Sequence, residues 1–236
     1  MPEIIDDRGV AVERMFSAIA PRYDFLNHLL SAGRDRAWRR EAVAATALPR
    51  EGILLDVCTG TADMALEAAR QFPDARIVGV DFSHPMIALG AAKIERARLA
   101  DRVRLQAAPA ETLPFPDASF DAATVAFGLR NLPDRHRGLR EMHRVLKPGG
   151  RAVILEFTTP PGPLLRRVYL WYFHRVLPFI GRLVSGHPLA YSYLPASVTE
   201  FPSPEGLAAW MRDAGFREVS YRLLTGGIVS IHVGWT

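Results

Sequence analysis

Strand-like and helix-like patterns alternate through the middle of the chain, and this alternation leaves few folds open. Short apolar runs typical of buried strands cover residues 52–57, 76–81, 102–107, 120–127 and 151–157. Helical patterns lie between them at residues 62–71, 85–99 and 135–146. Because strands that alternate with helices form a parallel sheet with helices on both faces, the sequence predicts a doubly wound, Rossmann-like α/β fold.

The pattern changes near the C-terminus. A helical stretch at residues 203–216 is followed by two strand-like runs, 217–224 and 226–235, which are joined through Thr225-Gly226-Gly227. So tight a connection makes the two strands antiparallel neighbours. We therefore expect a mostly parallel sheet with an antiparallel C-terminal hairpin strand.

The length of the chain, 236 residues, suits one domain with one core. We expect a single domain over residues 1–236, with a helical N-terminal cap at 1–50 and a lid or insertion at 160–200. The only cysteine, Cys58, allows no internal disulfide, and the N-terminus lacks the pattern of a secretory signal. Since no apolar run approaches the ~18 residues of a membrane span, we expect a soluble cytoplasmic protein.

The turn after the first strand indicates which cofactor the fold can hold. Dinucleotide-binding turns carry several glycines, which let the backbone approach a pyrophosphate, whereas this turn has only Gly60 at those positions. Cys58 and Ala62 crowd the turn, and Asp63 adds negative charge at the start of the helix. The cationic cofactor S-adenosylmethionine has no phosphate, so Asp56 and Asp63 favour its binding.

Two further positions follow the neighbouring strands. Asp81 ends the second strand, where a carboxylate can accept hydrogen bonds from both ribose hydroxyls. We expect Ser83 to cap the next helix and so to leave Asp81 for the ribose. Pro109 and Ala110 follow the third strand, where enzymes that bind S-adenosylmethionine in this type of fold hold its adenine. The backbone N–H of Ala110 is the expected donor.

Longer motifs resemble the C-methyltransferases of menaquinone and ubiquinone biosynthesis, which are class I S-adenosylmethionine-dependent enzymes. The N-terminal signature lies at residues 15–40, a second at 110–157, and the C-terminal end at 190–216 and 224–235. The N-terminal signature residues are Tyr23, Asp24, Asn27, Ser31, Gly33 and Trp38. By this resemblance, the cofactor contacts and the residues supporting the turn are Asp56, Gly60, Thr61, Asp81, Pro109 and Ala110. The chain departs from the family pattern at Leu26, Asp35, Ala62 and Pro109, and we expect Ala62 and Pro109 to affect cofactor affinity.

The resemblance implies methyl transfer to a ring carbon of a polyprenylated quinol, with S-adenosylhomocysteine as the second product. Demethylmenaquinol is the expected substrate, and a benzoquinol of the ubiquinone pathway is the alternative. Such a reaction needs an aligned methyl group and removal of a phenolic proton. Arg130 and Asn131, just past the fourth strand, are candidates to stabilise the phenolate, unless Arg130 is solvated or pairs with Asp134. Asp24 is a candidate base, or else a helix cap.

Other residues are expected to bind the substrate or the membrane surface. Tyr23, Asn27 and Tyr191 are candidates to line the substrate pocket, whereas His28, His136 and His143 read as surface or packing residues. The aromatic-rich stretch 163–184 suits a membrane interface. It carries Arg166, Arg167, Arg175 and Arg182. We expect transient contact of this stretch with the inner membrane face, and a homo-oligomer stays open.

Rival functions fit less well. The basic residues are nearly all arginine, Lys93 and Lys147 being the only lysines, which raises the possibility of an RNA methyltransferase. However, the sequence lacks an N-P-P-Y motif, a Pro-Cys nucleophile motif and a separate RNA-binding module, so no nucleic-acid partner is expected. The turn disfavours a dinucleotide-dependent oxidoreductase. No Cys, His and Asp cluster has the spacing of metal ligands, so no metal is expected, and another small-molecule methyltransferase stays open.

Overall fold

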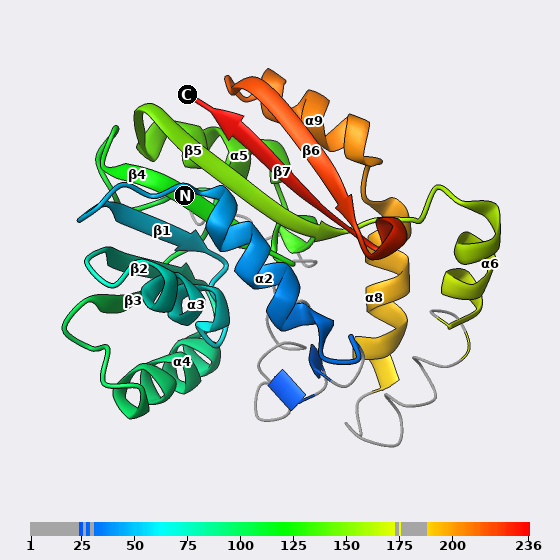
Figure 1. The fold of residues 1–236 in the computed structure, drawn as a ribbon, viewed down its shortest axis with the longest axis horizontal. Helices are drawn as coiled ribbons and strands as arrows, with labels where there is room; N and C mark the ends of the chain where they lie inside the picture. Colours follow the sequence, from blue (N-terminus) through cyan, green and yellow to red (C-terminus); the bar gives the residue numbers. More distant parts are fainter. Residues whose placement is uncertain (1–23, 26, 29–30, 173–174, 176–187) are drawn as a thin grey trace, which may run out of the picture.

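The computed structural model describes residues 24, 25, 27, 28, 31–172, 175 and 188–236, with only the backbone for 188–192. Within these residues, seven strands form one sheet in the order β3-β2-β1-β4-β5-β7-β6 (Figure 1). The strands are β1 (Ile53–Val57), β2 (Arg76–Asp81), β3 (Val103–Ala107), β4 (Phe120–Ala126), β5 (Leu146–Phe157), β6 (Arg217–Leu224) and β7 (Val229–Trp235). Strands β1 to β5 are parallel, whereas β7 is antiparallel to both β5 and β6. The predicted doubly wound sheet with an antiparallel C-terminal hairpin strand is confirmed.

The strand order reverses between β1 and β4. From β1 the chain builds outward through β2 and β3, and it then returns to the other side of β1 to add β4 and β5. Open parallel sheets bind ligands beyond the carboxyl ends of their strands at such a reversal. The loops that follow β1 and β4 are therefore the segments that position a site.

Helices cover both faces of the sheet. They are α2 (Arg34–Ala45), α3 (Asp63–Gln71), α4 (His84–Arg96), α5 (Arg135–Val145) and α9 (Pro204–Asp213). Leu54 shares one part of the core with Trp38 of α2 and with residues of α3 and α4. The next residue, Leu55, shares the other part with Leu139 of α5 and Met211 of α9. Since successive side chains of a strand point to opposite faces, α2, α3 and α4 cover one face, and α5 and α9 the other.

Strand β5 begins earlier than the sequence pattern predicts. It starts at Leu146 rather than at residue 151, so residues 146–150 also belong to the strand. Leu146 pairs with β4, and regular pairing then resumes only at Arg151. Pro148 has no N–H to donate to a neighbouring strand, and Gly149 has a φ of +78°. Pro148 and Gly149 therefore make the start of β5 irregular. Because both residues are typical of turns, the sequence does not predict a strand there.

The described parts of the predicted cap and insertion lie beside the sheet rather than within it. Helix α2 packs on α3 and β5, and the segment before α2 leads back toward the end of β1. Helices α6 (Pro163–Trp171) and α8 (Pro188–Glu200) lie at the end of the sheet to which the parallel strands point (Figure 1). In the part of the chain that the structure describes, no helix has the length and apolar character needed to cross a membrane.

Candidate active site

Asp56 lies under the turn that joins β1 to α3. Its side chain is buried, and its two oxygens accept hydrogen bonds from Thr59 Oγ1 at 2.6 Å and from Thr124 Oγ1 of β4 at 2.9 Å. Burial raises the pKa of this carboxyl to about 6, against the opposing effect of the two threonine bonds. Asp56 thus links the two strands between which the strand order reverses.

The turn takes its shape from residues with left-handed backbone conformations. Cys58, Gly60 and Ala62 have φ values of +55°, +55° and +67°, and Ala62 is the residue that precedes α3. Gly128, in the loop after β4, packs so closely here that a Cβ on it would lie 2.4 Å from Cys58 Cβ. A left-handed conformation costs an ordinary residue on the order of 1 kcal/mol, so Cys58 and Ala62 are strained at positions where a glycine would not be. Burial also raises the pKa of the Cys58 thiol, in keeping with a packing role.

Asp81 faces the same turn from the end of β2. Its Oδ2 accepts the backbone N–H of Gly60 at 2.8 Å, and its Oδ1 accepts the N–H of Ser83 at 2.9 Å. Ser83 occupies the position before α4, but its side chain makes no capping hydrogen bond, so the predicted side-chain cap is wrong. The predicted role of Asp81 toward the ribose stays a prediction. Each oxygen of Asp81 keeps further acceptor capacity, which a pair of ribose hydroxyls can use.

The loop after β3 lies next to Asp81. The N–H of Ala108 donates to the backbone oxygen of Asp81 at 3.0 Å, and a turn follows in which Thr112 N donates to Pro109 O at 3.2 Å. Ala110 is buried within this loop. The structure therefore brings Pro109 and Ala110 to the same corner as Asp81 and the β1 turn.

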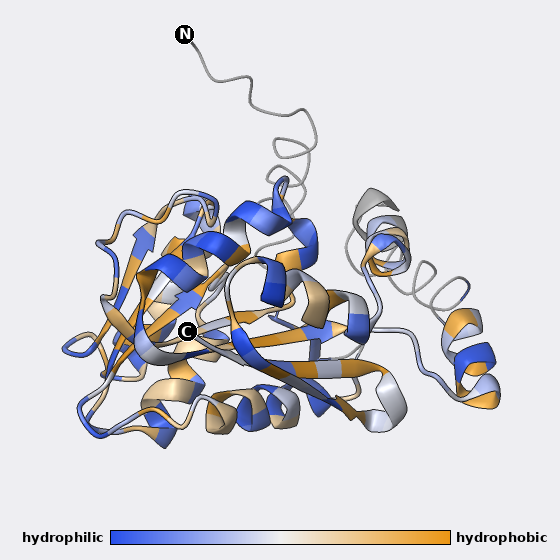
Figure 2. Cartoon of the chain, turned by 90° about the horizontal axis from the view of Figure 1, so that it is seen from above, coloured by the Kyte–Doolittle hydropathy of each residue, from blue (hydrophilic) through white to orange (hydrophobic). Residues whose placement is uncertain are grey.

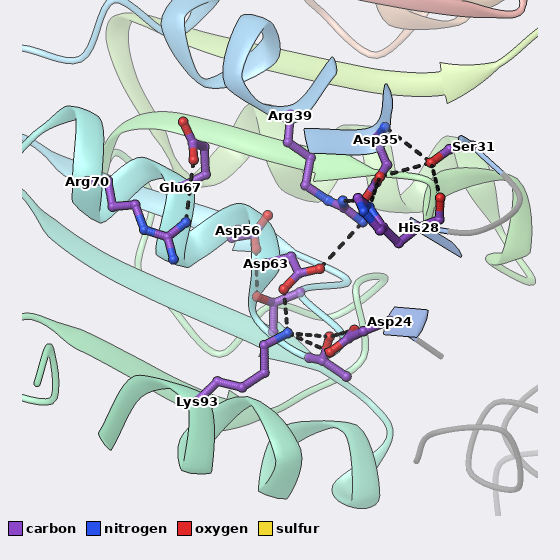
Figure 3. Close-up of polar contacts among 12 residues, drawn as sticks. Asp24, His28, Ser31, Asp35, Arg39, Asp56, Asp63, Glu67, Arg70 and Lys93 are labelled. Atoms are coloured by element: carbon purple, nitrogen blue, oxygen red, sulfur yellow. Dashed lines mark hydrogen bonds and ion pairs between the residues drawn. The ribbon is translucent and has the colours of Figure 1, made fainter. Parts of the chain in front are cut away.

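The N-terminal segment, by which we mean the described residues 24, 25, 27 and 28, reaches this corner through Asp24. Thr61 Oγ1 donates to Asp24 Oδ1 at 2.5 Å, and Lys93 Nζ of α4 donates to Asp24 Oδ2 at 2.8 Å (Figure 3). Lys93 also donates to Thr61 Oγ1 at 3.1 Å and forms an ion pair with Asp63. Two predicted site residues, Asp24 and Thr61, are thus in direct contact. Lys93 was not among the predicted site residues, and its only signal in the sequence is the rarity of lysine.

Arg130 lies in the short helix η1 (Leu129–Asn131), directly after β4. It is buried, and its Nη1 donates to Glu156 Oε2 at 2.9 Å and to Phe127 O at 2.5 Å, with the guanidinium over the Phe157 ring. Both alternatives considered for Arg130 are wrong, because it is not solvated and because Asp134 instead caps α5. Glu156 is the partner that the sequence did not reveal, since it lies in an apolar strand 26 residues away from Arg130.

Asn131 connects η1 to α8. Its Nδ2 donates to Phe127 O at 3.2 Å, and its Oδ1 accepts the hydroxyl of Tyr193 at 3.1 Å. The Nε of Arg130 adds a second link to α8 through Ser197 Oγ at 3.3 Å. Helix α8 is therefore held against the loop that carries Arg130 and Asn131, two of the three predicted catalytic residues.

The remaining predicted substrate residues are less defined. Asn27 is half-buried, and its backbone oxygen accepts the N–H of Ser31 at 3.0 Å. Tyr23 lies outside the described residues, as does Arg182 of the insertion, and the side chain of Tyr191 in α8 is also not described. Their roles stay predictions.

The histidines expected to be packing residues contact other side chains. His136 and His143 lie against the rings of Trp210 and Phe216, with centroids 4.6 Å and 5.1 Å apart. His28 Nδ1 is 3.1 Å from Asp35 Oδ1. Among the residues that the structure describes, no group of three or more His, Cys, Asp or Glu can hold a metal ion.

Comparisons with known proteins give a consistent picture. A family model described as the ubiE/COQ5 methyltransferase family matches residues 3–236. A ubiquinone/menaquinone biosynthesis C-methyltransferase of Geobacter sulfurreducens is 54% identical over 98% of this chain and 90% of its own. A demethylmenaquinone methyltransferase of Thermus thermophilus is 52% identical over 93% of this chain and 99% of its own.

Solved structures share the fold at low sequence identity. The [4+2]-cyclase SpnF matches with a TM-score of 0.73 and 20% identity, and the match covers 95% of each chain. An S-adenosylmethionine-dependent methyltransferase of Aquifex aeolicus matches with a TM-score of 0.64 and 17% identity, over 89% of this chain and 96% of that one. These matches show the architecture, and the sequence relatives carry the further comparison.

Proposed function

Since this chain belongs to the ubiE/COQ5 methyltransferase family, we propose that it methylates demethylmenaquinol to menaquinol, with S-adenosylmethionine as the methyl donor. Relatives named for menaquinone and ubiquinone biosynthesis, about half identical over nearly the whole chain, support C-methylation of a quinone precursor. The alternative substrate is a benzoquinol of the ubiquinone pathway. RNA methylation and dinucleotide-dependent oxidation find no support in the relatives.

The observation that carries the cofactor assignment is the acidic, glycine-poor turn after β1. Asp81 is held beside Gly60, where its carboxylate suits the ribose, and Pro109 and Ala110 adjoin it on the side proposed for adenine. Asp56 and Thr61 lie on the side proposed for the methionine portion. When bound, S-adenosylmethionine supplies an electrophilic methyl group on a sulfonium. The surrounding carboxylates favour that positive charge and would repel a pyrophosphate.

We assign Arg130 and Asn131 to the substrate side of the site. Arg130 donates from Nη1 to Phe127 O and Glu156, and from Nε to Ser197. Its Nη2 makes no hydrogen bond to another described residue. The rigid attachment of Nη1 and Nε leaves Nη2 as the donor able to stabilise a developing phenolate. Asn131 and Tyr193 lie beside it and can orient the phenol or a water that accepts its proton.

Helix α6 supports contact with a membrane surface, where a polyprenylated quinol resides. Its exposed apolar side chains include Leu164, Val168 and Trp171, at 78%, 54% and 61% exposure. Arg166 and Arg167 are exposed on the same helix, and Figure 2 shows apolar segments on this helix away from the body of the molecule. Apolar residues mixed with arginines suit the boundary between anionic headgroups and acyl chains.

The test combines binding with product identification. We expect isothermal titration calorimetry to show saturable binding of S-adenosylhomocysteine to the purified protein. We also expect mass spectrometry to find methylated menaquinol after incubation with S-adenosylmethionine and demethylmenaquinol in vesicles. Absence of binding at millimolar ligand would refute the cofactor assignment, and methylation of a demethylated benzoquinol alone would favour the ubiquinone pathway.

A further inference from the structure

Lys93 is the centre of an ion-pair network that joins the N-terminal segment to the turn after β1. Its ammonium group has three donors and bonds three acceptors, on Asp24, Thr61 and Asp63. These acceptors come from the N-terminal segment, the turn and the first residue of α3, so Lys93 of α4 links the N-terminal segment to the junction of the turn and α3 (Figure 3). Its side chain is only 21% exposed, which strengthens the pairs relative to surface ion pairs.

The network continues away from the turn through alternating charges. Arg39 of α2 lies 3.8 Å from Asp63 and 2.5 Å from Asp35, and Asp35 Oδ1 in turn accepts Ser31 Oγ at 2.9 Å. Together with Asp24 and Lys93, the network holds three carboxylates and two cations, a net charge of −1. Without Lys93, the carboxylates of Asp24 and Asp63 would repel each other across the position of its ammonium group.

We propose that Lys93 is a positioning residue that couples binding of S-adenosylmethionine to docking of the N-terminal segment. This inference rests on the proposed function, because it takes the β1 turn as the cofactor site. Lys93 holds Asp24 against Thr61, and Thr61 is part of the turn on which the cofactor lies. Cofactor binding orders the turn and thereby favours the docked Asp24, and by linkage the docked Asp24 favours the cofactor to the same extent.

The chain offers a matched control, because it contains only two lysines. Lys147, at the start of β5, forms one ion pair with Asp121 at 2.7 Å and belongs to no part of the site. We expect Lys93→Met to weaken the binding of S-adenosylhomocysteine at least tenfold by isothermal titration calorimetry. Lys147→Met should change the dissociation constant less than twofold, and Lys93→Arg, which keeps the charge, should recover most of the loss. Equal binding by Lys93→Met and wild type, or equal losses in both methionine variants, would overturn the inference.

A second measurement uses the unmodified protein and does not depend on a variant that folds. Amine acetylation followed by mass spectrometry reports the reactivity of each lysine separately. We expect Lys93 to react more slowly than Lys147, and to slow further when S-adenosylhomocysteine is bound, while Lys147 is unaffected. Unchanged labelling of Lys93 in a protein that binds the ligand would refute the coupling alone, whereas a wild type that binds no ligand would refute the proposed function as well.

Discussion

Ala62 combines a left-handed backbone conformation with a buried side chain in the turn after β1. Its left-handed backbone costs on the order of 1 kcal/mol, but its methyl group is fully buried, which returns about 0.8 kcal/mol. We therefore expect Ala62→Gly to change the free energy of unfolding by less than about 1 kcal/mol. The same change should tighten cofactor binding, because it removes a side chain from the turn, and calorimetric titration with S-adenosylhomocysteine measures the effect.

Ala118 provides the control for this substitution. It also has a positive φ, +51°, but it is exposed and lies in the loop before β4. Ala118→Gly should relieve strain without losing burial, so a modest gain in thermal stability is expected with no change in cofactor affinity. Equal affinity changes in both glycine variants would contradict a specific effect of Ala62.

His232 and Asp56 should give opposite pH dependences of stability. Burial lowers the pKa of His232 to about 4, so the unfolded chain binds the extra proton between about pH 6.5 and 4, and His232 reduces stability as the pH falls through this window. Asp56, with its pKa raised to about 6, does the reverse, because the folded state holds the extra proton between about pH 6 and 3.8. Each contribution is roughly 3 kcal/mol at its full extent.

Urea unfolding of variants between pH 4 and 7 separates the two contributions. Relative to wild type, His232→Gln should gain stability as the pH falls, whereas Asp56→Asn should lose stability over the same interval. Differences from wild type that do not vary with pH would show that neither group carries the shift. His232 Nε2 donates to Pro204 O at 2.8 Å, and its Nδ1 has no partner among the described residues, so a second proton on the ring would lack an acceptor.

At the scale of elements, the buried pair of Arg130 and Glu156 fixes η1 on β5. Glu156 is fully buried, and its oxygens accept both the backbone N–H and the guanidinium of Arg130. Glu156→Gln removes the charge that balances Arg130, and loss of one partner of a buried pair costs about 3–5 kcal/mol. We expect a lower urea midpoint by far-UV circular dichroism and a lower kcat with S-adenosylmethionine affinity little changed. A loss confined to cofactor affinity would contradict this assignment.

Local sequence patterns predict the bounds of most helices and strands, but they do not predict the long-range side-chain contacts between these elements. Four of the five parallel strands begin and end within one residue of the predicted runs. The central strands β1 and β4 are buried on both faces and are therefore largely apolar, whereas the edge strand β3 is mostly exposed and alternates apolar with polar residues. The start of β5 was missed because Pro148 and Gly149 normally mark a turn. Lys93 and Glu156 were missed for a different reason, since their partners are 69 and 26 residues away, and no spacing rule reports such contacts.

The proposed contact of α6 with a membrane surface can be tested apart from catalysis. The triple variant Leu164→Ser, Val168→Ser and Trp171→Ser removes three exposed apolar side chains and leaves both arginines in place. We expect weaker cosedimentation with vesicles that contain anionic lipid, and an unchanged thermal midpoint, since none of the three is buried. Leu223→Ser, which removes an exposed apolar side chain from the edge strand β6, serves as the control and should cosediment like wild type.

At the scale of the whole molecule, the functional parts gather at one end. The β1 turn, η1 and α8 meet where the parallel strands end, and α6 projects from the same end (Figure 1). Under the proposed function, this grouping lets a substrate keep its apolar tail at a membrane surface near α6 while its ring reaches the cofactor turn and η1. The resemblance of the chain to known methyltransferases indicates the chemistry, but this grouping depends on the strand order, which brings Cys58 and Gly128, 70 residues apart in sequence, into contact.

This arrangement predicts that tail length decides how much α6 matters. In assays with a polyprenylated quinol in vesicles, the triple α6 variant should lose most of its kcat/KM, because enzyme and substrate no longer meet at the same surface. With a short-tailed, water-soluble quinol the variant should match wild type, because the site itself is intact. High salt should weaken wild-type activity only in the vesicle assay, since it screens the arginines from anionic lipid. An equal loss on both substrates would instead make α6 part of the ring-binding pocket.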